Sequence, residues 1–203
     1  MLRLGLTGGI ASGKSAVAGM LRELGFHVLD ADGLGHTLME PGTRAYGEIV
    51  REFGTGVTGV DGRINRKKLG GMVFTDRGKL ERLNGIVHPR VEEEIVRQFG
   101  EWEKSGVRDA VFVEAALLVE AGYQKNLDGL VVAWCGPEQQ LERLMARGLG
   151  EEEARRRIAA QMPAEEKLKY ATEKIDCSGS MEETRRQVGE LAAKLRRVAA
   201  RNV

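Results

Sequence analysis

The stretch Gly8–Ser15, "GGIASGKS", directly follows the alternating apolar run "MLRLGLT". It fits the pattern Gly-x-x-x-x-Gly-Lys-Ser, in which glycines let backbone N–H groups converge on phosphate oxygens and the following helix adds its positive N-terminal end. In this pattern Lys14 reaches the β- and γ-phosphates and the Ser15 hydroxyl holds Mg²⁺. The alternative is a glycine-rich turn that only caps a helix. The position between a predicted strand and a predicted helix favours a polyphosphate site.

The segments around this loop predict a parallel sheet. Leucines alternate through residues 2–6 as in a strand, apolar residues recur at helical spacing from Lys14 to Leu24, and "FHVLDAD" predicts a second strand. A strand, a helix and a strand within about thirty residues form a βαβ unit with a right-handed crossover. The apolar runs in "DAVFVEAALLV" and "GLVVAWC" predict further strands that are covered on both faces.

The rest of the chain is mostly helical. Residues 33–106 are turn-rich, with an Asp-Gly turn in "VDGRI" and a helix that is expected to start at Pro89. "GPEQQLERLMAR" predicts a helix, the segment Gly148–Gly150 breaks it, and "EEEARRRIAAQM" resumes it. The last helix is amphipathic and is expected to pack on the sheet through Val188, Leu191, Leu195 and Val198.

Composition narrows the class of protein. The 203 residues suffice for one α/β core with room for a smaller insertion. With 31 basic and 30 acidic residues, bulk charge gives no support for binding nucleic acid or an acidic membrane. The cysteines, Cys135 and Cys177, lack metal-site spacing and are expected to be reduced thiols. No signal peptide or membrane-length apolar run is evident, so we expect a soluble cytoplasmic protein.

Two carboxylates follow the second predicted strand. Asp30 and Asp32 lie two residues apart, so in an extended segment their side chains point the same way. In a parallel sheet this strand end and the phosphate loop share the carboxyl edge, where ligands bind. Asp32 is therefore placed to accept a proton from an acceptor hydroxyl near the γ-phosphate. Capping of the next helix is an equally good interpretation from spacing alone.

Two classes of nucleotide-binding protein fit such a loop: a small-molecule kinase and a GTP-dependent switch. "DADG" and "EKID" resemble switch motifs, but a guanine-reading segment would have Asn or Thr where Glu173 stands. Arg143 and Arg147 are four residues apart, and Arg155–Arg157 follow the glycine break. This arginine-rich pair of helices favours a kinase lid that closes over phosphates. A solvated hairpin with ordinary charge pairs to glutamates is the alternative.

The order of several segments resembles that of the dephospho-CoA kinase family, whose members phosphorylate the ribose 3′-hydroxyl of dephospho-CoA in the last step of coenzyme A synthesis. The resemblance runs from Leu4 to about Leu191 and rests on "GLTGGIASGKS", "VLDADGLGH", "EPGT", "DGRINRKKL", "LNGIVHPRV", "ALLVEAG", "QLERLMAR", "RIAAQM" and "SGSMEE". The loop is shared by many families, whereas "DAD", "HP" and "LLVE" are more specific.

The resemblance implies roles for individual residues. Asp32 is expected to activate the 3′-hydroxyl, and Lys14 and Arg147 to stabilise the transferring phosphoryl group, with Ser15 on Mg²⁺. ATP binding is expected at Gly8, Gly9, Ala11, Ser12, Gly13, Lys14, Ser15, Ala16 and Arg147. Acceptor binding is expected at Asp32, Arg66, His88, Pro89, Leu118 and Glu120. ATP and Mg²⁺ are the implied cofactors, and dephospho-CoA is the implied partner, with no oligomer required.

The resemblance also implies a P-loop NTPase fold: a parallel sheet of about five strands with helices on both faces. The expected core comprises residues 1–32, 107–142 and 165–203, the helical acceptor-binding insertion residues 33–106, and the lid residues 143–164. Some positions depart from the family pattern: Glu114, Ala116, and the segment with Thr172, Cys177 and Ser178 that is expected to edge the adenine. A kinase for another nucleotide or small alcohol, and a GTP-binding switch, remain the alternatives.

Overall fold

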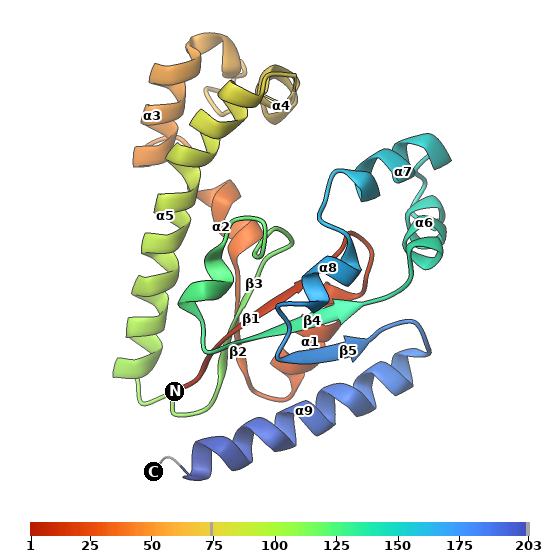
Figure 1. Ribbon diagram of the computed structural model, residues 1–203. Helices are drawn as coiled ribbons and strands as arrows, with labels where there is room; N and C mark the ends of the chain where they lie inside the picture. The colour runs from red at the N-terminus through yellow and green to blue at the C-terminus, as the bar shows by residue number, and fades with distance from the viewer. Residues whose placement is uncertain (74, 202–203) are drawn as a thin grey trace. The chain divides into compact units, whose positions relative to one another are not determined.

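The computed structural model describes residues 1–73 and 75–201. The chain divides into two compact units, one of residues 1–30 with 101–203 and the other of residues 31–100. The first unit contains β1 (Arg3–Gly8), α1 (Lys14–Glu23), β2 (His27–Asp30), β3 (Val111–Glu114), η2 (Tyr123–Asn126), β4 (Gly129–Trp134), α6 (Pro137–Ala146), α7 (Glu151–Ala159), α8 (Ala164–Leu168), β5 (Glu173–Asp176) and α9 (Met181–Arg201) (Figure 1). The second contains α2 (Ala31–Thr37), α3 (Arg44–Phe53), η1 (Thr55–Val57) and α4 (Arg66–Val73), and α5 (Arg77–Lys104) begins in it.

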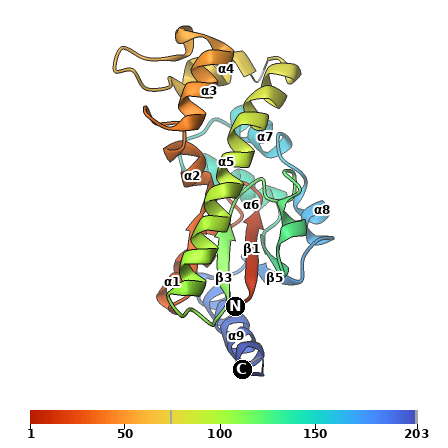
Figure 2. The ribbon, with the colours of Figure 1, turned by 90° about the vertical axis from the view of Figure 1, so that its left-hand side faces the viewer.

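The first unit is built on a five-stranded sheet in the order β2-β3-β1-β4-β5, and every neighbouring pair is parallel. The prediction of a parallel sheet of about five strands is confirmed. β1 lies at the centre, where Leu6 is opposite Glu114 of β3 and Val131 of β4, and Figure 2 shows β1 beside β3. The carboxyl ends of β1, β3 and β4 therefore meet at one edge, directly before the phosphate loop.

One face of this sheet is closed by two helices. α9 lies beside α1 and β5 (Figure 1), and their apolar side chains form one buried cluster with β1, β3 and β4. Val188, Leu191 and Leu195 belong to this cluster, so the predicted packing of the last helix on the sheet is confirmed for these three residues. Phe26 and Phe112 meet edge to face within it, with ring centroids 5.7 Å apart.

Two strands differ from the sequence prediction. β3 ends at Glu114, and the apolar residues that follow form turns in which Leu118 and Val119 are buried. Apolar character extended the predicted strand because buried turns and buried strands share it. β5 was missed because its sequence "EKID" is polar: only Ile175 is buried, as expected for a strand at the edge of a sheet.

Residues 31–100 have a hydrophobic core of their own. The buried side chains of this core are Ile49, Val57, Leu69 and Val73. The Asp-Gly turn is present: Thr58 and Ile64 pair as an antiparallel bridge around it, and Gly62 adopts the positive φ of 75° that the turn requires.

The helix expected to start at Pro89 starts earlier, and Pro89 lies inside α5. The Asp76 carboxylate accepts the Lys79 N–H at 3.0 Å, which caps the first turn; this hydrogen bond lowers the pKa of Asp76. Leu83 and Val87 pack on the core of the unit before the proline is reached. The packing of this first part of α5 stabilises the helix by more than the proline costs through the one helical hydrogen bond that it removes.

Among the described residues, no helix combines the length and the apolar character that a membrane span needs.

Candidate active site

The loop between β1 and α1 has the backbone that a phosphate-binding loop requires. Gly13 is left-handed at φ 106°, and a Cβ there would lie 2.9 Å from the Cβ and Sγ of Cys177. Ala11 is also left-handed, at φ 58°. The N–H groups of Ala11 and Gly13 have no acceptor within residues 1–73 and 75–201. Donors of this kind, next to a helix N-terminus, form an anion-binding concavity.

Lys14, the first residue of α1, is held by a buried carboxylate. Its Nζ lies 3.4 Å from Oε1 of Glu114, and Arg22 Nη2 lies 3.3 Å from Oε2 of the same side chain. Both Lys14 and Glu114 are nearly buried, with side chains 13% and 7% exposed. The sequence marked Glu114 as a departure from the family pattern but did not predict this contact. The sequence feature that could have indicated the contact is the position of Glu114 at the end of an apolar run. In the structure this position lies opposite Leu6 of β1.

The two carboxylates after β2 do not share an extended segment. β2 ends at Asp30, and α2 begins at Ala31, so Asp32 lies in the first turn of a helix. The premise that alternation aims both side chains the same way is therefore wrong. Asp32 is exposed and follows the carboxyl end of β2 by two residues, which keeps it next in sequence to the edge of the sheet.

The arginines of the expected lid have different roles. Arg143 in α6 donates from Nη1 to the Ala11 carbonyl at 3.1 Å and from Nη2 to the Cys177 carbonyl at 2.6 Å, so it braces the loop. Arg147 lies just after α6 ends and is exposed. Arg155–Arg157 all pair with glutamates of their own helix, α7. Those pairs match the alternative of an ordinary charged hairpin for α7.

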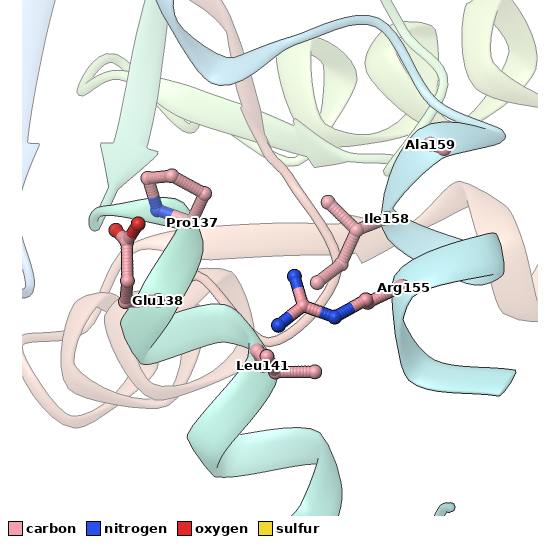
Figure 3. A pocket seen from close by; sticks show the side chains of 6 residues that line it. All are labelled: Pro137, Glu138, Leu141, Arg155, Ile158 and Ala159. Atoms are coloured by element: carbon pink, nitrogen blue, oxygen red, sulfur yellow. The ribbon is translucent and has the colours of Figure 1, made fainter. Parts of the chain in front are cut away.

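A small cavity lies between α6 and α7. It has a volume of about 240 Å³ and is lined by Pro137, Glu138, Leu141, Arg155, Ile158 and Ala159 (Figure 3). Figure 3 shows the Arg155 guanidinium extending toward Leu141, between the two helices. That guanidinium is already paired with Glu151.

The residues expected at the acceptor lie in both units. Arg66 begins α4, and His88 and Pro89 lie in the middle of α5; all three are exposed and belong to residues 31–100. Leu118 and Glu120 lie in the turns after β3 rather than on a strand. Leu118 is only 2% exposed and is a core residue.

Glu120 is engaged within the first unit. Its Oε1 accepts the Met162 N–H at 3.0 Å and lies 2.9 Å from Nζ of Lys167. Lys167 is fully buried and donates to the Ala116 carbonyl at 2.6 Å. No sequence pattern predicts this buried lysine, which links α8 to the turn after β3.

A model of the dephospho-CoA kinase family matches residues 2–183 of this chain. The chain belongs to that family. A dephospho-CoA kinase from Symbiobacterium thermophilum is 49% identical over 186 residues, which cover 91% of this chain and 77% of that relative. The solved structure of TT1252 from Thermus thermophilus is 37% identical with a TM-score of 0.83, over 96% of this chain and 97% of that one. The structure of the dephospho-CoA kinase from Campylobacter jejuni is 27% identical with a TM-score of 0.71, over 99% and 98%.

These matches confirm the resemblance and the P-loop kinase fold. In this member of the dephospho-CoA kinase family, the segment after β5 is braced from α6. Gln139 donates from Nε2 to the Ser178 carbonyl at 2.6 Å, and Arg143 holds the preceding carbonyl. The hydroxyl of Ser178 and the indole nitrogen of Trp134 are buried without a partner within the described residues. These two groups can each still form a hydrogen bond, and they lie in or beside the segment that is expected to edge the adenine of ATP.

Gly8→Ala is expected to destabilise this dephospho-CoA kinase family member by about 2–3 kcal/mol. A Cβ at Gly8 would lie 2.5 Å from the backbone carbonyl oxygen of Ala133 on β4, which cannot move aside, and would also clash with Ser12 Oγ. Denaturant unfolding followed by circular dichroism measures the change. Gly19→Ala in α1 is the matched control, because no atom lies within 4 Å of its new Cβ. We expect the control to gain about 0.5–1 kcal/mol; equal stability of the two variants would contradict the assigned loop packing.

Both cysteines are expected to react only after unfolding. They are free and buried, and each follows directly after paired residues of β4 and β5. Burial raises the pKa of the Cys177 thiol to about 11, and burial also raises the pKa of Cys135. Burial therefore favours the protonated form of both thiols, whereas the thiolate is the reactive form. An aromatic disulfide reagent should therefore detect both thiols in denaturant and neither in the native protein well below pH 11; rapid native reaction would contradict this burial.

Proposed function

We propose that this chain transfers the γ-phosphoryl group of ATP to the ribose 3′-hydroxyl of dephospho-CoA, giving coenzyme A and ADP. Membership of the dephospho-CoA kinase family over residues 2–183 is the observation that carries the proposal. The loop geometry supports it, because the Ala11 and Gly13 N–H groups, which have no acceptor within the described residues, occur together with Lys14 at the N-terminus of α1. Transfer of this kind depends mostly on positioning and charge stabilisation.

In this proposal Lys14 binds the β- and γ-phosphates of ATP. Its ion pair with Glu114 keeps the ammonium group at the carboxyl edge of the sheet, ready to move to the β- and γ-phosphates. Arg22 stays on Glu114 when Lys14 leaves, so the buried carboxylate keeps a cationic partner. The remaining ATP contacts are proposed at Gly8, Gly9, Ala11, Ser12, Gly13, Ser15 and Ala16, with Arg147 from the lid.

The donor set of the site fits Mg²⁺. Ser15 is exposed in the first turn of α1, and its hydroxyl is the protein ligand that would hold Mg²⁺. The described residues contain no cluster of three His, Cys, Asp or Glu side chains that could hold a metal. Oxygen ligands from one hydroxyl, phosphates and water suit Mg²⁺, which keeps several waters. When bound, Mg²⁺ supplies neutralising charge at the phosphate oxygens.

Asp32 is proposed as the general base that takes the proton of the 3′-hydroxyl. Its carboxylate is exposed, and it follows β2 at the edge where ligands of parallel sheets bind. Arg66, His88 and Pro89 are proposed to contact the acceptor from residues 31–100, and their exposure supports this. Leu118 and Glu120 are also proposed to form part of the acceptor site. Both lie in the turns after β3, where Glu120 binds Met162 and Lys167.

A coupled assay of ADP release tests the proposed function. With ATP and Mg²⁺, we expect rapid ADP release with dephospho-CoA and only background release with AMP, with adenosine or without an acceptor. Equal or faster turnover with AMP or adenosine would replace dephospho-CoA by another nucleotide or alcohol. Tight GTP binding with slow hydrolysis in the absence of any acceptor would instead indicate a nucleotide-operated switch.

A further inference from the structure

Three side chains from α6 and the segment after α7 hold the backbone of the phosphate loop. Gln140 donates from Nε2 to the Ile10 carbonyl at 2.9 Å. Arg143 donates from Nη1 to the Ala11 carbonyl at 3.1 Å. The Ile10 N–H donates to Oε1 of Gln161 at 2.7 Å. Both polar groups of Ile10 are thus bound by glutamines that lie 130 and 151 residues away in the sequence.

These contacts set the direction of the donors that a phosphate would use. In a trans peptide the carbonyl and the following N–H point in opposite directions. Holding the Ile10 carbonyl at Gln140 therefore aims the Ala11 N–H away from Gln140, and that N–H has no acceptor within the described chain. Ala11 also carries left-handed strain at φ 58°, which persists only where surrounding contacts hold it.

The segment that carries Gln161 is itself fixed to the sheet. Its neighbour Met162 donates to Glu120, and Lys167 binds both Glu120 and the Ala116 carbonyl from a fully buried position. Gln161 therefore lies between the end of α7 and a rigid anchor on the turn after β3. Its amide oxygen is therefore a fixed hydrogen-bond acceptor for the Ile10 N–H.

We propose that Gln161 is a positioning residue for the nucleotide: its amide oxygen accepts the Ile10 N–H, fixes the Gly9–Ile10 peptide next to the peptide that Gln140 holds, and so preorganises the loop for the triphosphate. The inference rests on the proposed function for the identity of the nucleotide and adds a residue to that site. Without the Gln161 amide oxygen, the loop becomes ordered only when the nucleotide binds. The free-energy cost of that ordering lowers the affinity for the nucleotide. The Gln161 contact is made to the phosphate loop itself, so we expect its loss to raise the KM for ATP more than the KM for dephospho-CoA.

Gln161→Met tests the proposal because methionine keeps the length of the side chain and removes the acceptor. By titration calorimetry with a non-hydrolysable ATP analogue and Mg²⁺, we expect the Kd to rise about five- to tenfold, the size of one hydrogen bond. The KM for ATP should rise similarly, and by more than the KM for dephospho-CoA. Gln161→Glu keeps an acceptor oxygen and, at high ionic strength where its added charge is screened, should stay closer to the parent protein than Gln161→Met.

Asp128→Leu is the matched control. Asp128 Oδ2 accepts the Arg3 N–H at 2.7 Å at the opposite, amino-terminal edge of the sheet. Asp128→Leu should lower the melting temperature as Gln161→Met does, and it should leave the Kd for the ATP analogue unchanged. An unchanged Kd for Gln161→Met, or a Gln161→Glu variant that is as weak as Gln161→Met, would overturn the proposal.

Failure of the inference is distinguishable from failure of the proposed function. Nucleotide affinity is measured without any acceptor, so it does not depend on dephospho-CoA being the substrate. A weaker Kd for Gln161→Met in a protein that does not phosphorylate dephospho-CoA would uphold the loop contact and reject the function. A normal Kd in an active kinase would do the reverse.

Discussion

Replacing Lys14 by alanine is expected to slow phosphoryl transfer by about two to three orders of magnitude, since it removes a fixed positive charge from the transferring group. Lys14 is the cation at the N-terminus of α1, within 3.4 Å of the buried Glu114 carboxylate. Arg22 keeps its own contact with Glu114 at 3.3 Å, so the carboxylate does not lose both cations in the variant. We therefore expect the loss to appear in kcat/KM while the fold remains intact.

Single-turnover measurement of ADP formation with saturating dephospho-CoA gives the rate of the chemical step. Arg22→Ala is the matched control, because it removes the other cation on Glu114 and leaves Lys14 in place. We expect the control to lose stability rather than rate. If Lys14→Ala and Arg22→Ala were slowed equally, the effect would come from the unpaired Glu114 carboxylate and not from a missing charge at the phosphates.

Asp32→Asn is expected to lower kcat by about two to four orders of magnitude, the usual range for loss of a general base. Asparagine keeps the size and the hydrogen-bonding reach of the side chain but cannot take a proton at neutral pH. The variant should bind ATP and dephospho-CoA with near-normal affinity. Initial rates over a range of both substrates separate kcat from the two KM values.

The competing interpretation of Asp32 is that its charge only stabilises the first turn of α2. That role predicts a lower melting temperature with little change in kcat. Asp30→Asn, two residues earlier at the end of β2, is the matched control and should leave kcat within a small factor of the parent value. Full turnover by Asp32→Asn would reject the general-base role.

The sequence predicted the parts of the fold that local patterns encode. The loop from Gly8 to Ser15, the strand–helix–strand unit around it and the packing of the last helix depend on spacing between near neighbours, and all three are present. Pro89 was misplaced because a proline at a helix start and a proline inside a well-packed helix look alike in sequence. β5 was missed because an edge strand needs few apolar residues.

The contacts that shape the candidate site lie beyond sequence reasoning. Glu114 reaches Lys14 only because β3 and β1 are adjacent, although the strands are about a hundred residues apart in the chain. The sequence pattern predicts both Gln140 and Gln161 on charged helices, and nothing in their spacing links them to Ile10; in the structure Gln161 lies after the end of α7. Such partners follow from the order of strands in the sheet, which single-sequence patterns do not specify.

The most direct test of the central claim is a crystal structure of the chain with a non-hydrolysable ATP analogue, Mg²⁺ and dephospho-CoA. We predict the triphosphate on the loop from Gly8 to Ser15 and the ribose 3′-oxygen in line with the γ-phosphorus. An Asp32 carboxylate oxygen should lie within about 2.6–3.2 Å of that 3′-oxygen. A complex in which the 3′-oxygen faces the γ-phosphorus while the Asp32 carboxylate points elsewhere would contradict the account.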